Sequence, residues 1–499
     1  MQISSLSQAL RFKDDISRLQ TQFEDLRRQL VTLKKSDTFS GLGSDRTLVL
    51  SLRSQVTETD GFISTIERVK LRTKASVDAL TRVEEIANTS KTASLTSTFE
   101  LLSTGQTQLQ ANSAANLDEL VSLLNLELDD RYLFAGKDTD TRPVALPGEI
   151  LDGDVTHAGL KQLIDERRQA DLGADNRGRL ALSQPNPEEV RIAESASPNA
   201  FGLKLSATTS NLTGTTVPQP TGTPAGLTIA FSATLPNEGE TISIEVDLPD
   251  GTTETITLQA TNTNPPEEGQ FLIGADEDAT AANFNAAFDT ALQDFSQTTL
   301  RAASAKEAAD NFFDYGNGTA PQRVDGPPFD TATDLIDGTP ANTVYWYKGD
   351  GAGIARDSIT ARIGEGQSIS YGARADESPI RDTLKSQAIY AALQFSDSDP
   401  NAPDAYAALT KRLGQELTFE GKASVADVVT ELGLTQHRLE QTQTRHETNL
   451  SLSLGLVEDR EGVDPYEISA KIGKLQVQIQ ASYQVTARAN ELSLLNFIR

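Results

Sequence analysis

The chain contains no cysteine among its 499 residues, and only one methionine and one tryptophan. The absence of cysteine excludes disulfides, thiolate metal sites and cysteine nucleophiles. Aromatic residues make up 6% and hydrophobic residues 37% of the chain, which is lean for an enzyme with a large compact core. Such a composition suits elongated helices and thin β layers, in which most side chains contact solvent.

Long apolar runs are also absent. No stretch approaches the ~20 apolar residues that a membrane-spanning helix needs. The first seven residues (MQISSLS) lack the basic and apolar segments of a cleaved secretory signal. We therefore expect no membrane insertion, and we expect any export to use a route without a cleaved leader.

Basic residues are scarce relative to acidic ones, with 44 Lys or Arg against 71 Asp or Glu and a net charge of −27. This field repels the phosphates of nucleic acids, so nucleic-acid binding is excluded as a function class. An acidic surface keeps an abundant protein soluble until a specific contact overrides repulsion. Acidic runs such as residues 458–461 are expected to be solvated loops.

The N-terminal part has a helical pattern. Residues 12–33 place apolar side chains at alternating steps of four and three, which is the seam of a helix that packs lengthwise on another. Residues 3–10 carry apolar positions in a different register, which predicts a stutter or a separate short helix. Further seams run over residues 49–80 and, more loosely, 102–128. Long helices are therefore predicted here.

The C-terminal part mirrors this pattern. Residues 425–439 and 468–498 repeat apolar side chains at helical spacing, and Pro465 after Asp464 is typical of a helix start. The apolar chain end needs a partner, either in the same molecule or in a neighbour. Periodicity alone leaves a closed bundle and a polymerising coiled coil equally open. The polymer interface that we expect comprises Leu6, Leu10, Ile16, Leu19, Phe23, Leu26, Leu30, Leu475, Ile479, Tyr483, Leu492, Leu494 and Leu495.

Heptads vanish between residues 143 and 377, where Thr, Asn, Pro and Gly become common. Alternating apolar and polar residues around a Pro-Asp-Gly turn predict a hairpin over residues 241–258, with residues 227–231 in the same sheet. Helices are expected over residues 279–314, and a second hairpin around residues 364–366. Together these features indicate a β-rich insertion.

We therefore predict an α+β fold in which long antiparallel N- and C-terminal helices form a coiled-coil rod with an inserted β-rich middle. The expected domains are an N-terminal helical core (1–142), a variable β-rich insertion of one or two subdomains (143–377), and a C-terminal helical core (378–499) that pairs with the first.

The sequence contains no recognisable catalytic or metal-binding motif. His157, His437 and His446 are too far apart to form a metal pair at helical spacing, and exposed histidines are the expected interpretation. Residues 137–142 contain D-x-D without the glycine and glutamate of a calcium loop. Residues 349–353 are glycine-rich but lack the lysine of a phosphate-binding loop. We expect no enzyme activity, no cofactor and no metal.

Two segments resemble a known family. Residues 130–143 (DRYLFAGKDTDTRP) are similar to the G-R-Y-L-F-S/A-G…T-x-P stretch of hook-associated members of the flagellin family. Residues 480–488 (QASYQVTAR) and 492–498 (LSLLNFI) resemble the end of the same proteins, and residues 368–377 show weaker similarity. The stretch LSSG-x-R-I-N-S-A-x-D-D of filament flagellins is only loosely matched after the first helix. This difference favours the protein at the hook–filament junction.

The resemblance implies a structural subunit of the bacterial flagellum, which acts in motility. In this family, subunits cross the type III export channel largely unfolded, and their terminal helices pack against neighbours. The implied partners are neighbouring copies, other hook-associated proteins, flagellin and an export chaperone, at an extracellular location. A filament-forming flagellin is the first alternative. A secreted adhesin, whose β insertion binds a ligand, is the second.

Overall fold

The computed structural model describes residues 2–195, 198–314 and 319–497; for residues 2–6, 8, 9 and 489–497 it describes the helical backbone only. Long N- and C-terminal helices and a β-rich middle confirm the predicted α+β class. The chain divides into two compact units. Unit 1 comprises Met1–Lys70, Ala361–Ile369 and His437–Arg499, and unit 2 comprises Leu71–Thr360 and Ser370–Gln436.

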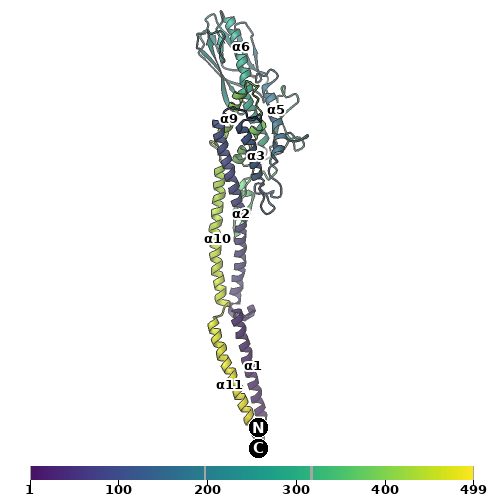
Figure 1. Cartoon of the computed structure of the whole chain (residues 1–499), viewed down its shortest axis with the longest axis vertical. Coiled ribbons are helices and arrows are strands. Elements are labelled where there is room, and N and C mark those ends of the chain that lie inside the picture. The colour runs from purple at the N-terminus through teal and green to yellow at the C-terminus, as the bar shows by residue number, and fades with distance from the viewer. Residues whose placement is uncertain (1, 196–197, 315–318, 498–499) are drawn as a thin grey trace. The chain divides into compact units, whose positions relative to one another are not determined.

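Unit 1 is built from long helices (Figure 1). They are α1 (Gln2–Thr32), α11 (Pro465–Phe497), the first part of α2 (Arg46–Thr96) and the last part of α10 (Val425–Glu461). The helix α1 is continuous from Gln2, so the register change near its start does not mark a separate helix. As predicted, α11 starts at Pro465, and Asp464 caps it by accepting a hydrogen bond from the Tyr466 amide at 2.8 Å.

The seam predicted on residues 49–80 is buried. In unit 1, Val49, Leu52, Ile63 and Ile66 are each at most 9% exposed. Their partner is α10, because the Lys70 ammonium donates to Gln443 at 3.1 Å and Leu439, Ser453 and Val457 are buried on the α10 side. Because apolar burial supplies the driving force for helix pairing, this seam holds the two helices together.

The predicted hairpin around residues 364–366 is present as β11 (Thr360–Gly364) and β12 (Gln367–Ser370). Gly366 adopts φ +65° in the turn, a conformation that glycine accepts without strain. Within unit 1, His446 contacts the hairpin through Nε2, which lies 2.7 Å from the carbonyl oxygen of Ile363. His446 also stacks on Phe62, so the expectation of an exposed histidine is wrong at this position.

Unit 2 contains a helical layer around one large core. Its helices, besides the remaining parts of α2 and α10, are α3 (Gln108–Leu124), α4 (Pro147–Asp152), α5 (Leu160–Leu172), α7 (Arg301–Phe313), α8 (Ser378–Ala392) and α9 (Ala402–Glu416). Trp346 is fully buried in this core, and its indole nitrogen donates to the Phe313 carbonyl at 2.9 Å. A capping box between Thr107 and Gln110 fixes the start of α3.

Two four-stranded sheets form the β part of unit 2. One has the order β1 (Leu180–Ser183), β2 (Glu189–Glu194), β5 (Gly226–Phe231), β4 (Thr215–Thr216); the other has the order β3 (Lys204–Ser210), β6 (Thr241–Asp247), β7 (Thr253–Thr261), β8 (Gln270–Leu272). The β6–β7 hairpin was predicted. The expectation that residues 227–231 share its sheet is wrong, because β5 pairs with β2 and β4.

One helix closes the core between these sheets. The predicted helices over residues 279–314 are α6 (Glu277–Phe295) and α7, joined by a π-helical turn (Ser296–Leu300). The rings of Phe284 and Phe288 of α6 stack with their centroids 5.9 Å apart, and Phe284 also contacts Phe231 of β5 and Phe271 of β8. The remaining short elements are β9 (Gln322–Val324), β10 (Leu335–Asp337) and the 3-10 turns Phe39–Asp45 and Ala355–Ser358.

Candidate assembly surface

The two terminal helices lie side by side in opposite directions. The Gln20 side chain donates to the Tyr483 hydroxyl at 2.7 Å, and Lys34 forms an antiparallel bridge with Gly462. The residue number thus rises along α1 as it falls along α11. Two distant parts of the sequence are brought together as the fold prediction required (Figure 1).

The pair buries few of its apolar side chains. Among the predicted interface residues, Leu475 is buried, Ile16, Leu19, Phe23, Leu26, Leu30 and Ile479 are half-buried, and Leu10 and Tyr483 are exposed. The side chains of Leu6, Leu492, Leu494 and Leu495 lie outside the described residues. In the described part of the two helices, only Ile468 and Leu475 are fully buried among apolar residues. Most of the described apolar seam is therefore only partly covered.

The junction between α1 and α2 lies beside the junction between α10 and α11. Between α1 and α2, and between α10 and α11, the backbones form a short clip: the Lys35 amide donates to the Glu461 carbonyl at 2.8 Å, and the Val463 amide donates to the Leu33 carbonyl at 3.2 Å. Arg53 binds the Glu461 carboxylate with two nitrogens of its guanidinium group. Glu461 is buried inside a helix, so the expectation of a solvated acidic loop is wrong there.

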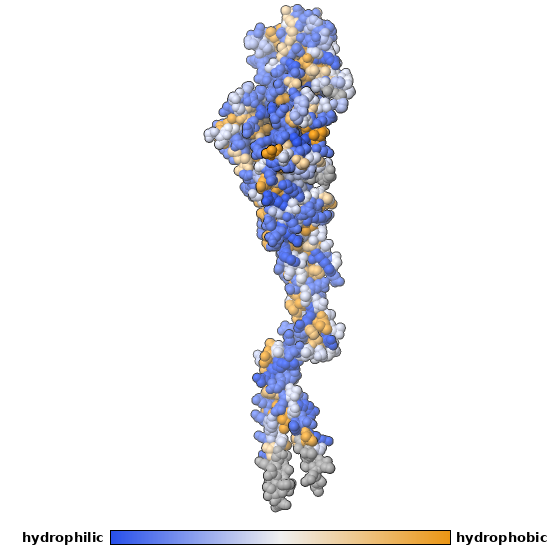
Figure 2. Space-filling model, turned by 90° about the vertical axis from the view of Figure 1, so that its right-hand side faces the viewer, coloured by the Kyte–Doolittle hydropathy of each residue, from blue (hydrophilic) through white to orange (hydrophobic). Residues whose placement is uncertain are grey.

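Exposed leucines surround this clip in unit 1, and sequence reasoning missed them. Figure 2 shows hydrophobic residues, coloured orange, on the outer surface of the helices. The exposed large apolar residues near the clip are Val31, Leu33, Phe39, Leu48, Leu50, Leu452, Leu454 and Leu456. The available signal was the alternation LSLSLGL at residues 450–456, because an alternating pattern in a helix places leucines on more than one face.

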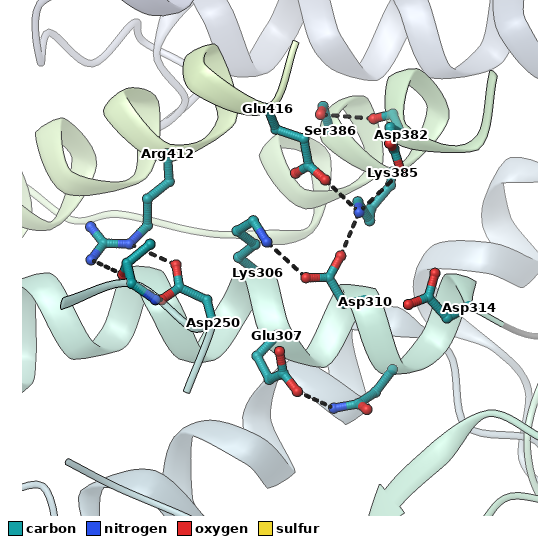
Figure 3. A network of polar contacts seen from close by, with 12 residues as sticks. Asp250, Lys306, Glu307, Asp310, Asp314, Asp382, Lys385, Ser386, Arg412 and Glu416 are labelled. Carbon is teal, nitrogen blue, oxygen red and sulfur yellow. Dashed lines mark hydrogen bonds and ion pairs between the residues drawn. The ribbon is translucent and has the colours of Figure 1, made fainter. Parts of the chain in front are cut away.

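Unit 2 contains a buried ion network (Figure 3). The ammonium group of Lys385 on α8 contacts Asp310 of α7, Asp382 at 3.3 Å and Glu416 of α9 at 2.6 Å. Burial acts to lower the pKa of Lys385, but the three carboxylates outweigh it and raise the pKa. The network therefore holds three helices together as a set of compensated charges.

A second buried ion pair fastens the β6–β7 turn to α9. Arg412 donates to Asp250 at 3.1 Å, and neither side chain is more than 4% exposed (Figure 3). Lys411, which precedes Arg412 in α9, contacts Glu254 at 3.0 Å. Because an unpaired buried charge is costly, these contacts fix the sheet against the helical layer within unit 2.

Glu307 on α7 is the one described carboxyl whose pKa is raised toward neutrality with a value of about 7. Burial is the main cause, and Asp310 and Asp171 add to it, while Arg167 at 3.6 Å opposes it. Asn311 donates to this carboxyl at 3.3 Å. The charged neighbours of Glu307, which are Arg167 and Asp171 of α5 and Asp310 of α7, belong to the contact between these two helices, and this indicates a structural role.

No arrangement of the described residues suggests a metal centre. In the parts of the chain that the structure describes, no three of His, Asp and Glu come together as potential ligands. His157 belongs to a turn, where its Nδ1 lies 2.7 Å from Asp154, and His437 is exposed on α10. Among the described helices, none combines the length and apolar character needed to cross a bilayer.

Comparison with known protein families gives a match at the C-terminal end of the chain. Residues 420–498, which include all of α10 and α11, match the bacterial flagellin C-terminal helical region. No curated protein matches the chain. Flagellins are structural proteins of the bacterial flagellum that assemble into polymers. The chain therefore carries a C-terminal helical region similar to that of bacterial flagellins.

Proposed function

We propose that the protein is a structural subunit that joins the flagellar hook to the filament and polymerises through its terminal helices. The flagellar role follows from the family match. The position at the junction is supported by the resemblance of residues 130–143 and 480–498 to hook-associated proteins. The protein then acts by binding neighbours, and its partners are copies of itself, other hook-associated proteins, flagellin and an export chaperone.

One observation carries the polymerisation proposal: α1 and α11 pair, yet they leave most of their apolar seam half-buried or exposed. Burying a leucine fully is worth ~1.5–3 kcal/mol relative to exposing it. Several half-buried residues along one pair of helices therefore offer enough free energy for association. Neighbouring copies would complete the contacts of Ile16, Leu19, Phe23, Leu26, Leu30 and Ile479 together with Leu6, Leu10, Leu475, Tyr483, Leu492, Leu494 and Leu495.

The domain arrangement that we propose follows from this role. Residues 1–142 and 378–499 provide the helical core, and residues 143–377 form an outward-facing insertion. Export to an extracellular position completes the proposal. The lack of cysteine is consistent with transit in an unfolded state, because no disulfide can form on the way.

Truncation after residue 489 tests the assembly. We expect a soluble chain that no longer enters flagella, because the apolar end of α11 is lost. Ile16→Asp is a subtler variant with the same expected loss, and Lys13→Asp on the exposed face of α1 is its matched control. Normal flagella from the truncated chain would contradict polymerisation through the terminal helices.

Immunogold labelling of intact flagella separates the junction protein from its alternatives. A short labelled layer between hook and filament supports the proposal. Label along the whole filament indicates a filament flagellin, an alternative that the size of the insertion favours. A deletion strain that swims normally, together with ligand binding by the secreted full-length chain, would point instead to an adhesin.

A further inference from the structure

A groove runs between β8 and α6 in unit 2. It has a volume of about 500 Å³ and is lined by β8, by the loop that precedes this strand and by one face of α6. That face consists of residues at the three- and four-residue spacing of a helix: Asn283, Ala286, Ala287, Thr290, Ala291 and Asp294. Because three of these side chains are alanines, little fills the space beside the strand.

The strand β8 is the last of its sheet, and it pairs with β7 in parallel. The Gly269 carbonyl accepts a hydrogen bond from β7 at 2.9 Å, and the Ile273 amide donates to β7 at 2.8 Å. The backbone groups of alternate residues from 269 to 273 therefore face β7. Those of Gln270 and Leu272 face the open edge of the sheet.

Part of this open edge is already used within the chain. The Gln270 amide donates to the Glu267 carbonyl at 3.1 Å, and the Leu272 carbonyl accepts from the Asn283 side chain at 3.0 Å. Among the described residues, the Gln270 carbonyl and the Leu272 amide have no partner. One residue of an added parallel strand satisfies both groups, whereas an antiparallel strand would need the two groups that are occupied.

Three carboxylates lie toward the end of the groove at which β8 begins. Glu267 and Glu268 precede β8 and are exposed. On α6, three helical turns, or ~16 Å, separate Asp294 from Asn283, the residue that contacts Leu272 at the other end. As far as the described residues show, no basic side chain lines the groove. Its charge therefore attracts Lys and Arg and repels acidic segments.

We propose that this groove binds an extended, basic segment of another protein, which joins β8 as a parallel strand. In strand addition, backbone hydrogen bonds hold the peptide, and the surrounding side chains select its sequence. The inference goes beyond the proposed polymerisation and does not depend on it, because the groove belongs to unit 2 and the terminal helices belong to unit 1.

The groove also specifies the order of residues in the bound segment. A residue that pairs with Phe271 shares its face of the sheet, and this face is turned toward α6, where Phe271 contacts Phe284. An apolar side chain at this position lies against Ala287. Because the strands are parallel, the residues that precede it lie beside the start of β8, near Glu267 and Asp294. We therefore expect Lys or Arg residues first and an apolar residue after them.

Titration of a labelled peptide with the purified full-length chain tests the proposal. The probe is the capped peptide Lys-Lys-Thr-Val-Thr-Val with a fluorophore at its N-terminus, and binding is followed by fluorescence anisotropy. We expect saturable binding that weakens as salt is added. One control peptide has the reversed sequence, and another is N-methylated at both valines and so cannot donate to the Gln270 carbonyl. Each should bind at least ~10-fold more weakly.

Variants of the chain locate the site. Glu267→Lys combined with Glu268→Lys reverses two carboxylates of the groove and should weaken binding at least ~10-fold. Asp397→Lys combined with Glu420→Lys is the matched control, because it changes the charge equally at two exposed loop carboxylates outside the groove. Ala286→Trp, at an exposed position of α6, should fill the groove and abolish binding without changing the circular dichroism spectrum.

The remaining outcomes would contradict the proposal. Equal binding of the reversed or the N-methylated peptide would show charge attraction without strand addition. Unchanged binding by the Ala286→Trp chain would place the peptide elsewhere. Equally tight binding of spermine would indicate a site for small polycations instead of a peptide. None of these results bears on polymerisation, which truncation of α11 tests separately.

Discussion

Unit 1 and unit 2 differ in how completely their apolar side chains are buried. Unit 2 encloses Trp346, Tyr390 and a cluster of phenylalanines at 0–1% exposure, and it compensates its buried charges internally. Unit 1 consists of paired helices whose apolar seams are partly covered at α1 and α11 and whose outer faces carry exposed leucines. Unit 2 can therefore be stable in a single copy, whereas unit 1 has apolar surface left for contacts with other molecules.

The charges follow the same division. Nearly all of the net charge of −27 lies in unit 2, which holds 53 Asp or Glu against 25 Lys or Arg, whereas unit 1 holds 18 against 19, so charge repulsion between copies arises mainly from unit 2. A uniform distribution would impose repulsion on the apolar contacts. The segregation indicates that association and solubility are separate properties here, which substitutions can change independently.

The largest expected effect is at the buried network of unit 2. Lys385→Met leaves Asp310, Asp382 and Glu416 without their shared cation, and removing one partner of a buried ion cluster costs ~3–5 kcal/mol. Urea unfolding of the purified chain measures the loss. Lys74→Met breaks only an exposed pair with Asp78 and should cost less than ~0.5 kcal/mol. Equal losses would refute the distinction.

Truncation of apolar residues compares the two units directly. Phe284→Ala in the unit 2 core removes a fully buried ring and should cost ~3–5 kcal/mol. Ile16→Ala on α1 removes a half-buried side chain and should cost less than ~1 kcal/mol in the monomeric chain. Thermal unfolding followed by circular dichroism checks both. A large effect of Ile16→Ala would mean that α1 is already complete within one molecule.

The pH dependence of unit 2 depends on Glu307. Because its pKa of about 7 in the folded chain exceeds the unfolded value, the folded state binds a proton more tightly. Stability is therefore highest at low pH for this group and falls as the pH rises from about 4.5 through 7. Glu307→Gln should remove this decline and stabilise the chain by up to ~3 kcal/mol at pH 8, with little effect near pH 4.5.

Unfolding measured in urea at both pH values checks this prediction. Glu85→Gln on the exposed surface of α2 is a suitable control, since its carboxyl contacts only the exposed Arg82. A Glu307→Gln chain that is less stable than the wild type at pH 8 would show that the contact with Arg167 outweighs the burial of the carboxylate.

The sequence predicted the long helices and the two hairpins, because each depends on local periodicity. It also predicted the pairing of the chain ends, because both ends carry an apolar seam that needs a partner. It did not predict the sheet membership of β5, since strand order depends on contacts between residues far apart. It also did not predict that Glu461 is buried against Arg53 or that His446 stacks on Phe62. Both involve polar residues whose burial is decided by a partner from another element.

The same limit explains the partial prediction of the assembly surface. A heptad seam marks the residues that pack lengthwise, and those of α1 and α11 were found in this way. The exposed leucines beside the clip, such as Leu454 and Leu456, have no heptad spacing, and only their position on either side of a buried seam reveals them. Heptad spacing therefore reveals the surface that pairs within the chain but not the apolar side chains on the outer sides of the helices.

The smallest expected effect concerns the clip that joins the two halves of unit 1. Glu461→Gln weakens the contact with Arg53, which is 43% exposed, so the loss should be only ~1 kcal/mol and local. Hydrogen exchange should show faster exchange of the amides of Lys35 and Val463, whose backbone bonds close the clip, and no change in α8. Arg460→Gln, whose contact with Asp45 is already 4.0 Å long, should leave these rates unchanged. Faster exchange throughout α1 and α11 would mean that the clip stabilises the whole terminal pair, so that unit 1 would depend less on neighbouring copies than its exposed leucines indicate.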